Sequence, residues 1–317
     1  MKQRHDVPSW QSWADRHAGW VFASPWLTGV IVLMLLSMVG SIALSMVRWD
    51  GVALSGMTWV GTTHYREILT NDSDFVIALR NSLVYAIFAV PLGLLSSLML
   101  ALLLNTAIRG ISFFRTLYYM PHVLGGVATI MIWRWIYHPE FGLLNSMIRE
   151  VYGLVATLGV TQATTWPVPA WLYSATWAKP SMLLMTLWGA GGAMLIFLAA
   201  LQNVPEHLYE AARIDGAGRV RCFWHITLPQ ISPAMFFNLI MGIIGTLQIF
   251  HQAYLLEAPG QRKSLLFYVL YLYRRAFEHY EMGYASALAW ILFVIIMLLT
   301  AIVLISGRYW VYYEGEK

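Results

Sequence analysis

The chain has 317 residues, of which 59% are hydrophobic and only 11% carry a charge. Soluble domains have roughly 25% charged residues, so this composition excludes an ordinary soluble domain and indicates an integral membrane protein. The net charge of +4 does not point to a nucleic-acid partner, because membrane proteins keep basic residues in their cytoplasmic loops. Cys222 is the single cysteine, which excludes an internal disulfide and a cysteine metal cluster.

The N-terminal segment superficially resembles a signal peptide, because Lys2, Arg4 and Arg16 precede a long apolar run. That run extends over 21–47, whereas the apolar region of a signal peptide has about 7–15 residues. We therefore expect a retained first membrane span.

Uncharged apolar runs predict six membrane spans, because about 20 apolar residues are needed to cross the hydrocarbon core. The spans are expected at 21–47, 81–104, 116–137, 180–202, 234–256 and 284–307. A further uncharged run, 151–178, contains polar residues and two prolines, and we interpret it as an interfacial or extracytoplasmic loop with short helices. The predicted fold class is an all-α integral membrane protein with six transmembrane helices.

An even number of spans places both chain ends on the same side of the membrane. With these ends in the cytoplasm, the inner segments carry ten lysines and arginines, and the longer outer loops carry eight. This difference favours a cytoplasmic N-terminus by the positive-inside rule. No aspartate or glutamate lies in a predicted span, which argues against a carrier that is driven by protons on its own.

A charged segment, 203–229, separates the fourth and fifth spans and must face water. Asn203 is expected to cap a helix whose first turn holds Pro205. Leu208, Ala211 and Ala212 recur at helical spacing and predict one apolar face of small residues.

The charged residues of this helix, Glu206, Glu210 and Arg213, gather on another face because they are spaced by three or four positions. Gly216 and Gly218 are expected to end the helix through a left-handed turn. A second amphipathic stretch, which includes Phe223 and Trp224, is expected to end at Pro229.

Two interpretations of this segment are open. It could rest on the bilayer surface, where Phe223 and Trp224 would hold it. The pair Ala211 and Ala212 favours insertion into a cleft of a soluble partner protein, because a lipid-facing helix prefers bulky side chains.

Three short motifs in this segment carry a specific resemblance: Glu-Ala-Ala at 210–212, Asp-Gly-Ala at 215–217 and Ile-Thr-Leu-Pro at 226–229. They resemble the cytoplasmic signature of the permease subunits of binding-protein-dependent ABC importers. Residues 198–205, 253–254 and 283–287 resemble the carbohydrate-importing branch, the maltose-type permeases. At 257–260 the chain reads Glu-Ala-Pro-Gly, where that branch usually has Thr-x-Gly-Gly-Pro.

The resemblance implies a type I ABC importer permease fold with a cytoplasmic coupling helix. It divides the chain into an N-terminal cytoplasmic segment with the first span and an outer loop (1–74), the permease core (75–307) and a cytoplasmic tail (308–317). The residues it implies in coupling to an ATPase are Glu206, Glu210, Ala211, Ala212, Arg213, Asp215 and Gly216. No catalytic residue and no metal site is predicted, because the histidines show no ligand spacing.

The implied partners are two ATP-binding subunits, a second homologous permease and an extracytoplasmic solute-binding protein, in the inner membrane of a bacterial cell and in contact with its lipid. ATP and Mg²⁺ would bind to the partner subunits, because this chain lacks the Gly-x-x-x-x-Gly-Lys-[Ser/Thr] phosphate loop. No nucleic acid is expected.

A sugar pathway needs an aromatic face beside uncharged hydrogen-bonding groups. The residues that we expect along it are Trp188, Gly189, Thr246, Gln248 and Tyr254. The competing interpretation is that these residues pack or tie helices together, and that Gly189, Gly191 and Gly192 permit close helix approach. Two other functions stay open: a permease for a polyol, glycerol-phosphate or oligopeptide, and a self-contained channel or membrane enzyme.

Overall fold

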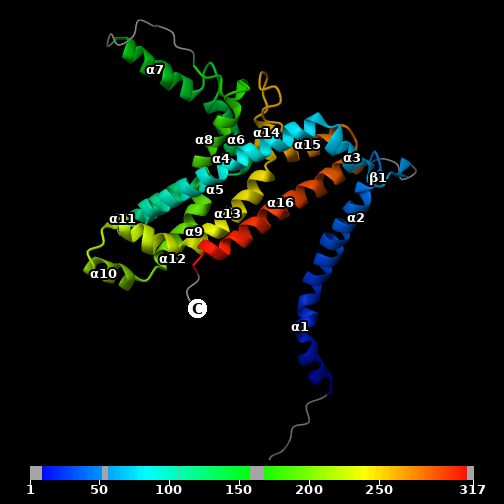
Figure 1. The fold of residues 1–317 in the computed structure, drawn as a ribbon, viewed down its shortest axis with the longest axis horizontal. Coiled ribbons are helices and arrows are strands. Elements are labelled where there is room, and N and C mark those ends of the chain that lie inside the picture. The colour runs from blue at the N-terminus through cyan, green and yellow to red at the C-terminus, as the bar shows by residue number, and fades with distance from the viewer. Residues whose placement is uncertain (1–8, 52–55, 107, 158–167, 313–317) are drawn as a thin grey trace, which may run out of the picture. The chain divides into compact units, whose positions relative to one another are not determined.

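A computed structural model describes residues 9–51, 56–106, 108–157 and 168–312 of the chain (Figure 1). The chain forms two compact units. The first consists of Met1–Thr70 and Arg275–Trp290, and the second of Asn71–Arg274 and Ile291–Lys317.

The first unit begins with one long apolar helical stretch. It consists of α1 (Ser9–Gly29), the π-helical turn η1 (Val30–Leu35) and α2 (Leu36–Ser45). From Ala18 to Ser45 this stretch is long and apolar enough to span a membrane, and most of its apolar side chains are exposed. Exposed apolar side chains along a whole helix are what a lipid-facing span requires. The predicted first span is therefore a helix.

A small antiparallel ribbon follows this span. Strand β1 (Val47–Arg48) pairs with β2 (Thr58–Trp59), with Val47 opposite Trp59. Helix α3 (Thr63–Thr70) comes next, and the unit also holds the start of α16 (Met282–Trp310). A Cβ atom at Gly283 would lie 1.8 Å from the carbonyl oxygen of Val47, so only glycine permits this close approach of α16 to β1.

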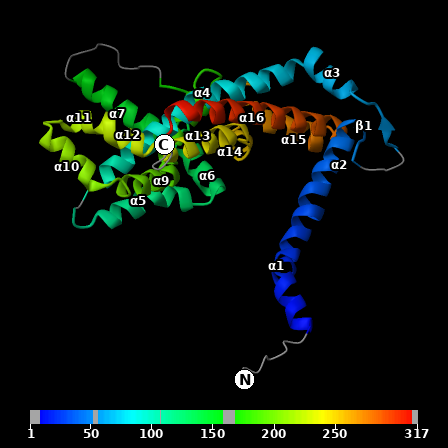
Figure 2. The ribbon, with the colours of Figure 1, turned by 60° about the horizontal axis from the view of Figure 1, so that its bottom comes forward.

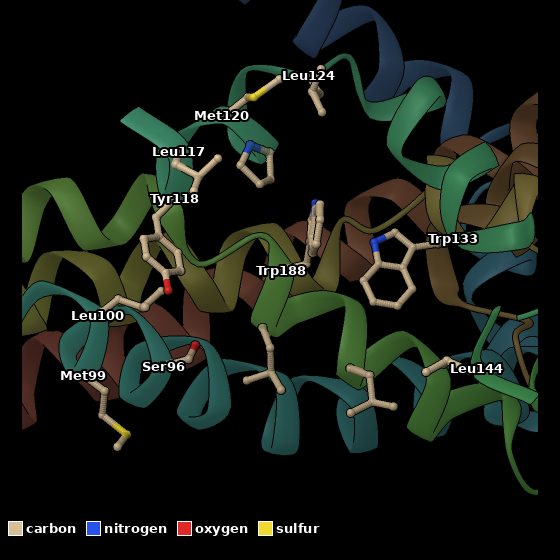
Figure 3. A pocket seen from close by; sticks show the side chains of 13 residues that line it. Ser96, Met99, Leu100, Leu117, Tyr118, Met120, Leu124, Trp133, Leu144 and Trp188 are labelled. Atoms are coloured by element: carbon tan, nitrogen blue, oxygen red, sulfur yellow. The ribbon is translucent and has the colours of Figure 1, made fainter. Parts of the chain in front are cut away.

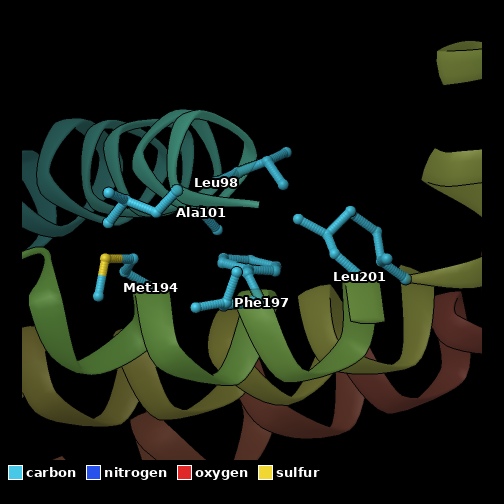
Figure 4. Close-up of a cluster of buried hydrophobic side chains, with 8 residues drawn as sticks. Leu98, Ala101, Met194, Phe197 and Leu201 are labelled. Atoms are coloured by element: carbon cyan, nitrogen blue, oxygen red, sulfur yellow. The ribbon is translucent and has the colours of Figure 1, made fainter. Parts of the chain in front are cut away.

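The second unit is built around α4 (Ser73–Leu104), whose first turn is capped by Asp72 through the backbone N–H groups of Asp74 and Phe75. Helices α8 (Ala178–Trp188), α9 (Gly191–Gln202), α13 (Ser232–Leu247) and α15 (Tyr268–Tyr273) pack against α4. Figure 4 shows the densest core, where Leu98 and Ala101 of α4 face Met194 and Phe197 of α9.

This unit also contains a set of further helical elements. They are α5 (Ile111–Val123), α6 (Gly126–Ile136), α7 (Leu143–Thr157), η3 (Trp171–Tyr173), α10 (Glu206–Ile214), α11 (Arg219–Cys222), η4 (Phe223–Thr227), α12 (Leu228–Gln230), α14 (His251–Leu255) and η5 (Arg274–Glu278), which runs on into the first unit. Within this unit, α10 and α11 lie at one end and α14 and α15 at the other, as Figure 1 and the turned view in Figure 2 both show.

Several of the predicted spans are not single continuous helices. Three of the described helices are long and apolar enough to cross a membrane without a break: Ala18–Ser45, Ser73–Leu104 and Met282–Trp310. The predicted span 180–202 is bent by 42° between α8 and α9, and α13 is bent by 65° from the helix before it. The predicted span 116–137 breaks between α5 and α6, and the span 234–256 breaks between α13 and α14. Uncharged residues at these breaks hide them from a charge-based search.

The uncharged run 151–178 does not form one spanning helix in its described part. It holds the end of α7 and the 3₁₀ turn η3, in agreement with the expected short helices. Its polar residues Gln162, Thr164 and Thr165, together with Pro167, lie outside the described residues.

Candidate functional site

The charged segment between α9 and α13 forms a short exposed helix, α10, as predicted. The helix begins at Glu206, with Pro205 as its N-cap, and no residue of it is buried. Glu206 in the first turn and Arg213 in the last turn both complement the helix dipole. The prediction that Asn203 caps this helix was wrong, because Asn203 ends α9 instead.

Gly216 ends α10 through a tight hydrogen-bonded turn. Its φ angle of +74° is left-handed, and its N–H donates to the carbonyl of Arg213 (3.0 Å). The N–H of Ala217 reaches back to the carbonyl of Ala212 (2.9 Å). These two bonds form a Schellman motif, which fixes the end of a helix and satisfies its last carbonyls. The prediction that Gly216 ends the helix through a left-handed turn is thus confirmed. Gly218 has an ordinary φ angle and caps the next helix.

Exposure divides the predicted coupling residues. Glu206, Glu210, Ala211, Arg213, Asp215 and Gly216 are exposed, and Ala212 is half-buried together with Leu208. The sequence interpretation placed Ala211 and Ala212 on one face of α10. In the structure Ala211 does not share the inner face with Ala212. It lies on the outer face with Glu210 and with Ile214, whose side chain is 87% exposed.

Both flanks of α10 are attached to the core of the second unit. Val204 precedes the helix, Phe223 follows it, and both pack against the cluster around Phe197. The Tyr209 hydroxyl also makes a hydrogen bond of 2.9 Å with the hydroxyl of Thr227 in η4. A movement imposed on α10 would therefore reach α4 and α9.

The second amphipathic stretch, which includes Phe223 and Trp224, does not end at Pro229 as predicted. Helix α12 continues to Gln230, and α13 begins at Ser232.

A second feature of this unit is a cavity of about 480 Å³ at three helix breaks. Its walls come from the junctions between α5 and α6, between α8 and α9, and between α13 and α14. A helix that breaks inside a membrane frees backbone polar groups, which is tolerated where the break lines a cavity. In transporters, such discontinuous helices commonly form the substrate site.

Four of the five predicted pathway residues meet in this cavity. Trp188 and Gly189 reach it from the end of α8, and Thr246 and Gln248 reach it from the end of α13. Tyr254 is not among its lining residues and instead stacks on Phe250, with ring centroids 5.6 Å apart. None of the lining residues carries a permanent charge; His122 and His251 are the ionisable ones other than tyrosine.

Sequence reasoning missed the polar residues that α4 and α6 contribute to this cavity. Thr129 lines it, and the buried hydroxyl oxygen of this residue has no hydrogen-bond partner in the described part of the chain. The hydroxyl groups of Tyr85 and Thr186, which also line it, lie 3.3 Å apart. A helix break within the expected span 116–137 would have drawn attention to Thr129, but hydropathy does not register such breaks.

Two other polar residues of the predicted spans make hydrogen bonds within the fold. Asn81 donates to the carbonyls of Lys263 (2.8 Å) and Leu266 (2.9 Å), and Asn238 donates to a carbonyl of its own helix. A Cβ atom at Gly191 would lie 2.4 Å from the carbonyl oxygen of Tyr118, so this glycine permits the close approach of α9 to α5.

A larger apolar cavity of about 1000 Å³ adjoins two of these helix breaks, the one after α5 and the one after α8. Figure 3 shows Leu117 and Tyr118 of α5 on one side and Trp133 of α6 on the other, with Trp188 between them. The rings of Trp133 and Trp188 meet edge to face, with centroids 5.8 Å apart, and both residues line the two cavities. Their indole rings therefore form part of the boundary between an apolar and a more polar space.

Comparison with known proteins agrees with this architecture. Residues 89–311 match the family model of the binding-protein-dependent transport system inner membrane component. The chain is 36% identical to the probable ABC transporter permease protein YesP of Bacillus subtilis (strain 168), with 96% of this chain and 94% of that protein covered. It is 30% identical to the arabinooligosaccharides transport system permease protein AraP of Halalkalibacterium halodurans, over 89% of this chain and 84% of that protein.

A solved structure shares the fold. One chain of the bacterial alginate ABC transporter, crystallised in complex with an alginate pentasaccharide-bound periplasmic protein, superposes with a TM-score of 0.78 at 20% identity. The match covers 95% of this chain and 98% of that chain, which confirms the predicted all-α permease fold. The protein is therefore an integral membrane protein that belongs to the family of inner membrane components of binding-protein-dependent transport systems.

Proposed function

We propose that this chain is a non-catalytic transmembrane permease subunit of an ATP-driven importer for a sugar or oligosaccharide. It would form the pathway with a second permease in the inner membrane of a bacterial cell, crossing that membrane several times. An extracytoplasmic binding protein would deliver the solute, and two partner subunits would bind ATP and Mg²⁺. The relative named for arabinooligosaccharides and the fold shared with the alginate transporter support a saccharide as the solute.

The observation that carries this proposal is the attachment of α10. The exposed face of the helix with Glu210 and Ala211 is available to a partner protein, and its two flanks pack on the core between α4 and α9. Closure of the ATPase partners on ATP would push α10 as a rigid element. Such a push would favour one of two helix arrangements, which is how rigid-body switching gives alternating access.

The chemistry of the broken-helix cavity supports an uncharged, polyhydroxylated solute. Its polar groups include the hydroxyls of Tyr85, Thr129 and Thr246 and the amide of Gln248, beside the indole ring of Trp188. No lysine or arginine lines it, so a phosphate group would meet no fixed positive charge. A saccharide is therefore favoured over glycerol-phosphate.

Reconstitution of the whole transporter tests the proposal. Proteoliposomes that contain both permeases and the ATPases should hydrolyse ATP faster when the binding protein carries its saccharide. Glu210→Lys should abolish that stimulation, because it reverses a charge on the outer face of α10. The matched control Glu150→Lys makes the same charge change at an exposed position of α7 and should retain the stimulation. Unaltered stimulation in Glu210→Lys would refute the coupling role of α10.

A further inference from the structure

The first unit contains a polar pocket of about 340 Å³ that the coupling segment and the broken-helix cavity do not use. Its walls come from the end of β1, from α3 and from the segment that leads into α16. The residues that line it are Arg48, Trp49, Asp50, His64, Glu67, Arg275, Tyr280, Glu281, Gly283 and Tyr284.

His64 gives this pocket a polar group that the fold leaves unused. The side chain is only 5% exposed, and its Nε2 lies 3.3 Å from the carbonyl oxygen of Val47. Its Nδ1 is buried and has no hydrogen-bond partner in the described part of the chain. A buried polar atom without a partner destabilises the folded state. Because His64 lines the pocket, a small rotation of its ring would turn this atom toward a ligand, which would supply the missing partner.

The other buried residues form a rigid base for the pocket. Tyr284 is 5% exposed and meets the edge of the His64 ring, with centroids 5.8 Å apart. The guanidinium of Arg275 lies 4.9 Å from the centre of the Tyr284 ring and forms an ion pair of 2.9 Å with Glu281. The close contact of Gly283 with Val47 holds this base against β1.

The chemistry of the lining suits a neutral saccharide. Two guanidinium groups and three carboxylates are intermixed, so the pocket attracts neither a strong anion nor a strong cation. Guanidinium and carboxylate groups are planar and offer paired donors or acceptors, which match adjacent hydroxyl groups. The rings of Trp49 and Tyr280 add the aromatic surface on which the apolar face of a sugar ring packs.

Chain order gives the side of the membrane. The pocket residues precede α4 or follow α15, whereas the coupling segment lies between α9 and α13. The span predicted at 234–256 places one membrane crossing between the charged segment 203–229 and the segment before α16. If α10 faces the cytoplasm, as the proposed function requires, the pocket opens on the extracytoplasmic side.

We propose that this pocket of the first unit binds one unit of a neutral saccharide on the extracytoplasmic side, with the free Nδ1 of His64 bonded to a sugar hydroxyl. This inference rests on the proposed function for the side of the membrane and for the kind of solute. It adds a saccharide site that is separate from the cavity at the helix breaks, because the two share no lining residue.

The single cysteine of the chain makes a labelling test possible. In a Cys222→Ala background, Glu67→Cys places a thiol at the pocket, and Arg66→Cys places one at the adjacent exposed position of α3 outside the lining. The complete transporter in nanodiscs is treated with a membrane-impermeant maleimide, with or without arabinotriose, lactose or maltotriose. At ten times its dissociation constant, a bound saccharide should slow labelling of Glu67→Cys by about tenfold and leave Arg66→Cys unchanged.

A ring-preserving variant tests the role of His64 itself. His64→Phe keeps an aromatic ring against Tyr284 and removes both ring nitrogens. In the Glu67→Cys background, it should raise the saccharide concentration for half-protection by about fivefold, the effect of losing one hydrogen bond. An unchanged concentration would remove His64 from the site.

The outcomes separate this inference from the proposed function. If the transporter takes up one of the three saccharides but none slows labelling of Glu67→Cys, the pocket proposal is wrong and the proposed function stands. If a saccharide protects the thiol but none is taken up, the pocket stands and the sugar-import function is wrong. Protection by the empty binding protein alone would identify a protein-docking surface and would overturn the saccharide site.

Discussion

Gly216 is a position where the proposed coupling through α10 can be disturbed without a steric clash. Its φ angle of +74° is unfavourable for residues that have a Cβ atom, but a Cβ atom placed there meets no heavy atom within 4 Å. Gly216→Ala therefore changes the backbone energy of the turn and creates no clash. The variant should fold and assemble with its partners while the end of α10 frays.

The magnitude of this effect follows from the backbone conformation. A left-handed conformation costs roughly 1–2 kcal/mol for a residue with a Cβ atom. That cost would lower the ratio of closed to frayed turns by a factor of about 5–30. Gly218→Ala is the matched control, because Gly218 has a φ angle of −74° and equally open surroundings. Gly216→Asn should recover part of the loss, since asparagine tolerates this conformation.

Two measurements on the reconstituted transporter test this reasoning. Hydrogen exchange at the Ala217 amide, which donates to Ala212, should quicken in Gly216→Ala and stay slow in Gly218→Ala. The amount of saccharide imported per ATP hydrolysed should fall in Gly216→Ala alone. If exchange quickens but import per ATP is unchanged, a fixed end of α10 is not needed for coupling.

Three further predictions concern other positions. Thr129→Val removes the partnerless hydroxyl of the broken-helix cavity. The KM for saccharide import should rise about fivefold, and the thermal unfolding temperature should stay unchanged or rise. A lower unfolding temperature would show that the hydroxyl has a structural role. Gly283→Ala forces a Cβ atom against the Val47 carbonyl and should lower the unfolding temperature, whereas Gly40→Ala, with open surroundings, should not. Gly191→Ala should destabilise the packing of α9 on α5, and normal stability in detergent would contradict the 2.4 Å approach to Tyr118.

The sequence predicted the coupling segment well because local rules control it. A glycine after a short amphipathic helix predicts a left-handed end, and Gly216 provides one. The N-cap of α10 was predicted at Asn203 and lies at Pro205, because Asn203 already ends α9. Which of Ala211 and Ala212 faces outward depends on packing against η4, and residue spacing within one helix could not show it.

Helix breaks were not predictable from the absence of charge. Apolar residues around Leu124 and Ile249 keep the hydropathy high, although the helices stop there. Such breaks are stable because several of them meet at one cavity, which brings together residues far apart in the chain. Thr129 and Trp188 become neighbours of one cavity only in the folded protein, so sequence spacing identified Trp188 by its chemistry and missed Thr129.

The first unit brings together residues that lie far apart in the chain. The sequence divides the chain at residue 74, and in the structure Arg275–Trp290 forms one compact unit with Met1–Thr70. Gly283 and Tyr284 drew attention only as part of a family-like motif. Their contacts with Val47 and His64 supply a physical reason for these residue types.

Cross-linking of α10 to the ATPase tests the central claim most directly. In the Cys222→Ala background, Ala211→Cys places a thiol on the exposed face of α10, and Met147→Cys places one on α7, where the native side chain is 55% exposed. A short bifunctional reagent should join Ala211→Cys to a partner ATPase subunit, more strongly with ATP than without it, and should leave Met147→Cys unjoined. Absence of a cross-link at Ala211→Cys in an assembled, active transporter would contradict the role of α10 as the coupling helix.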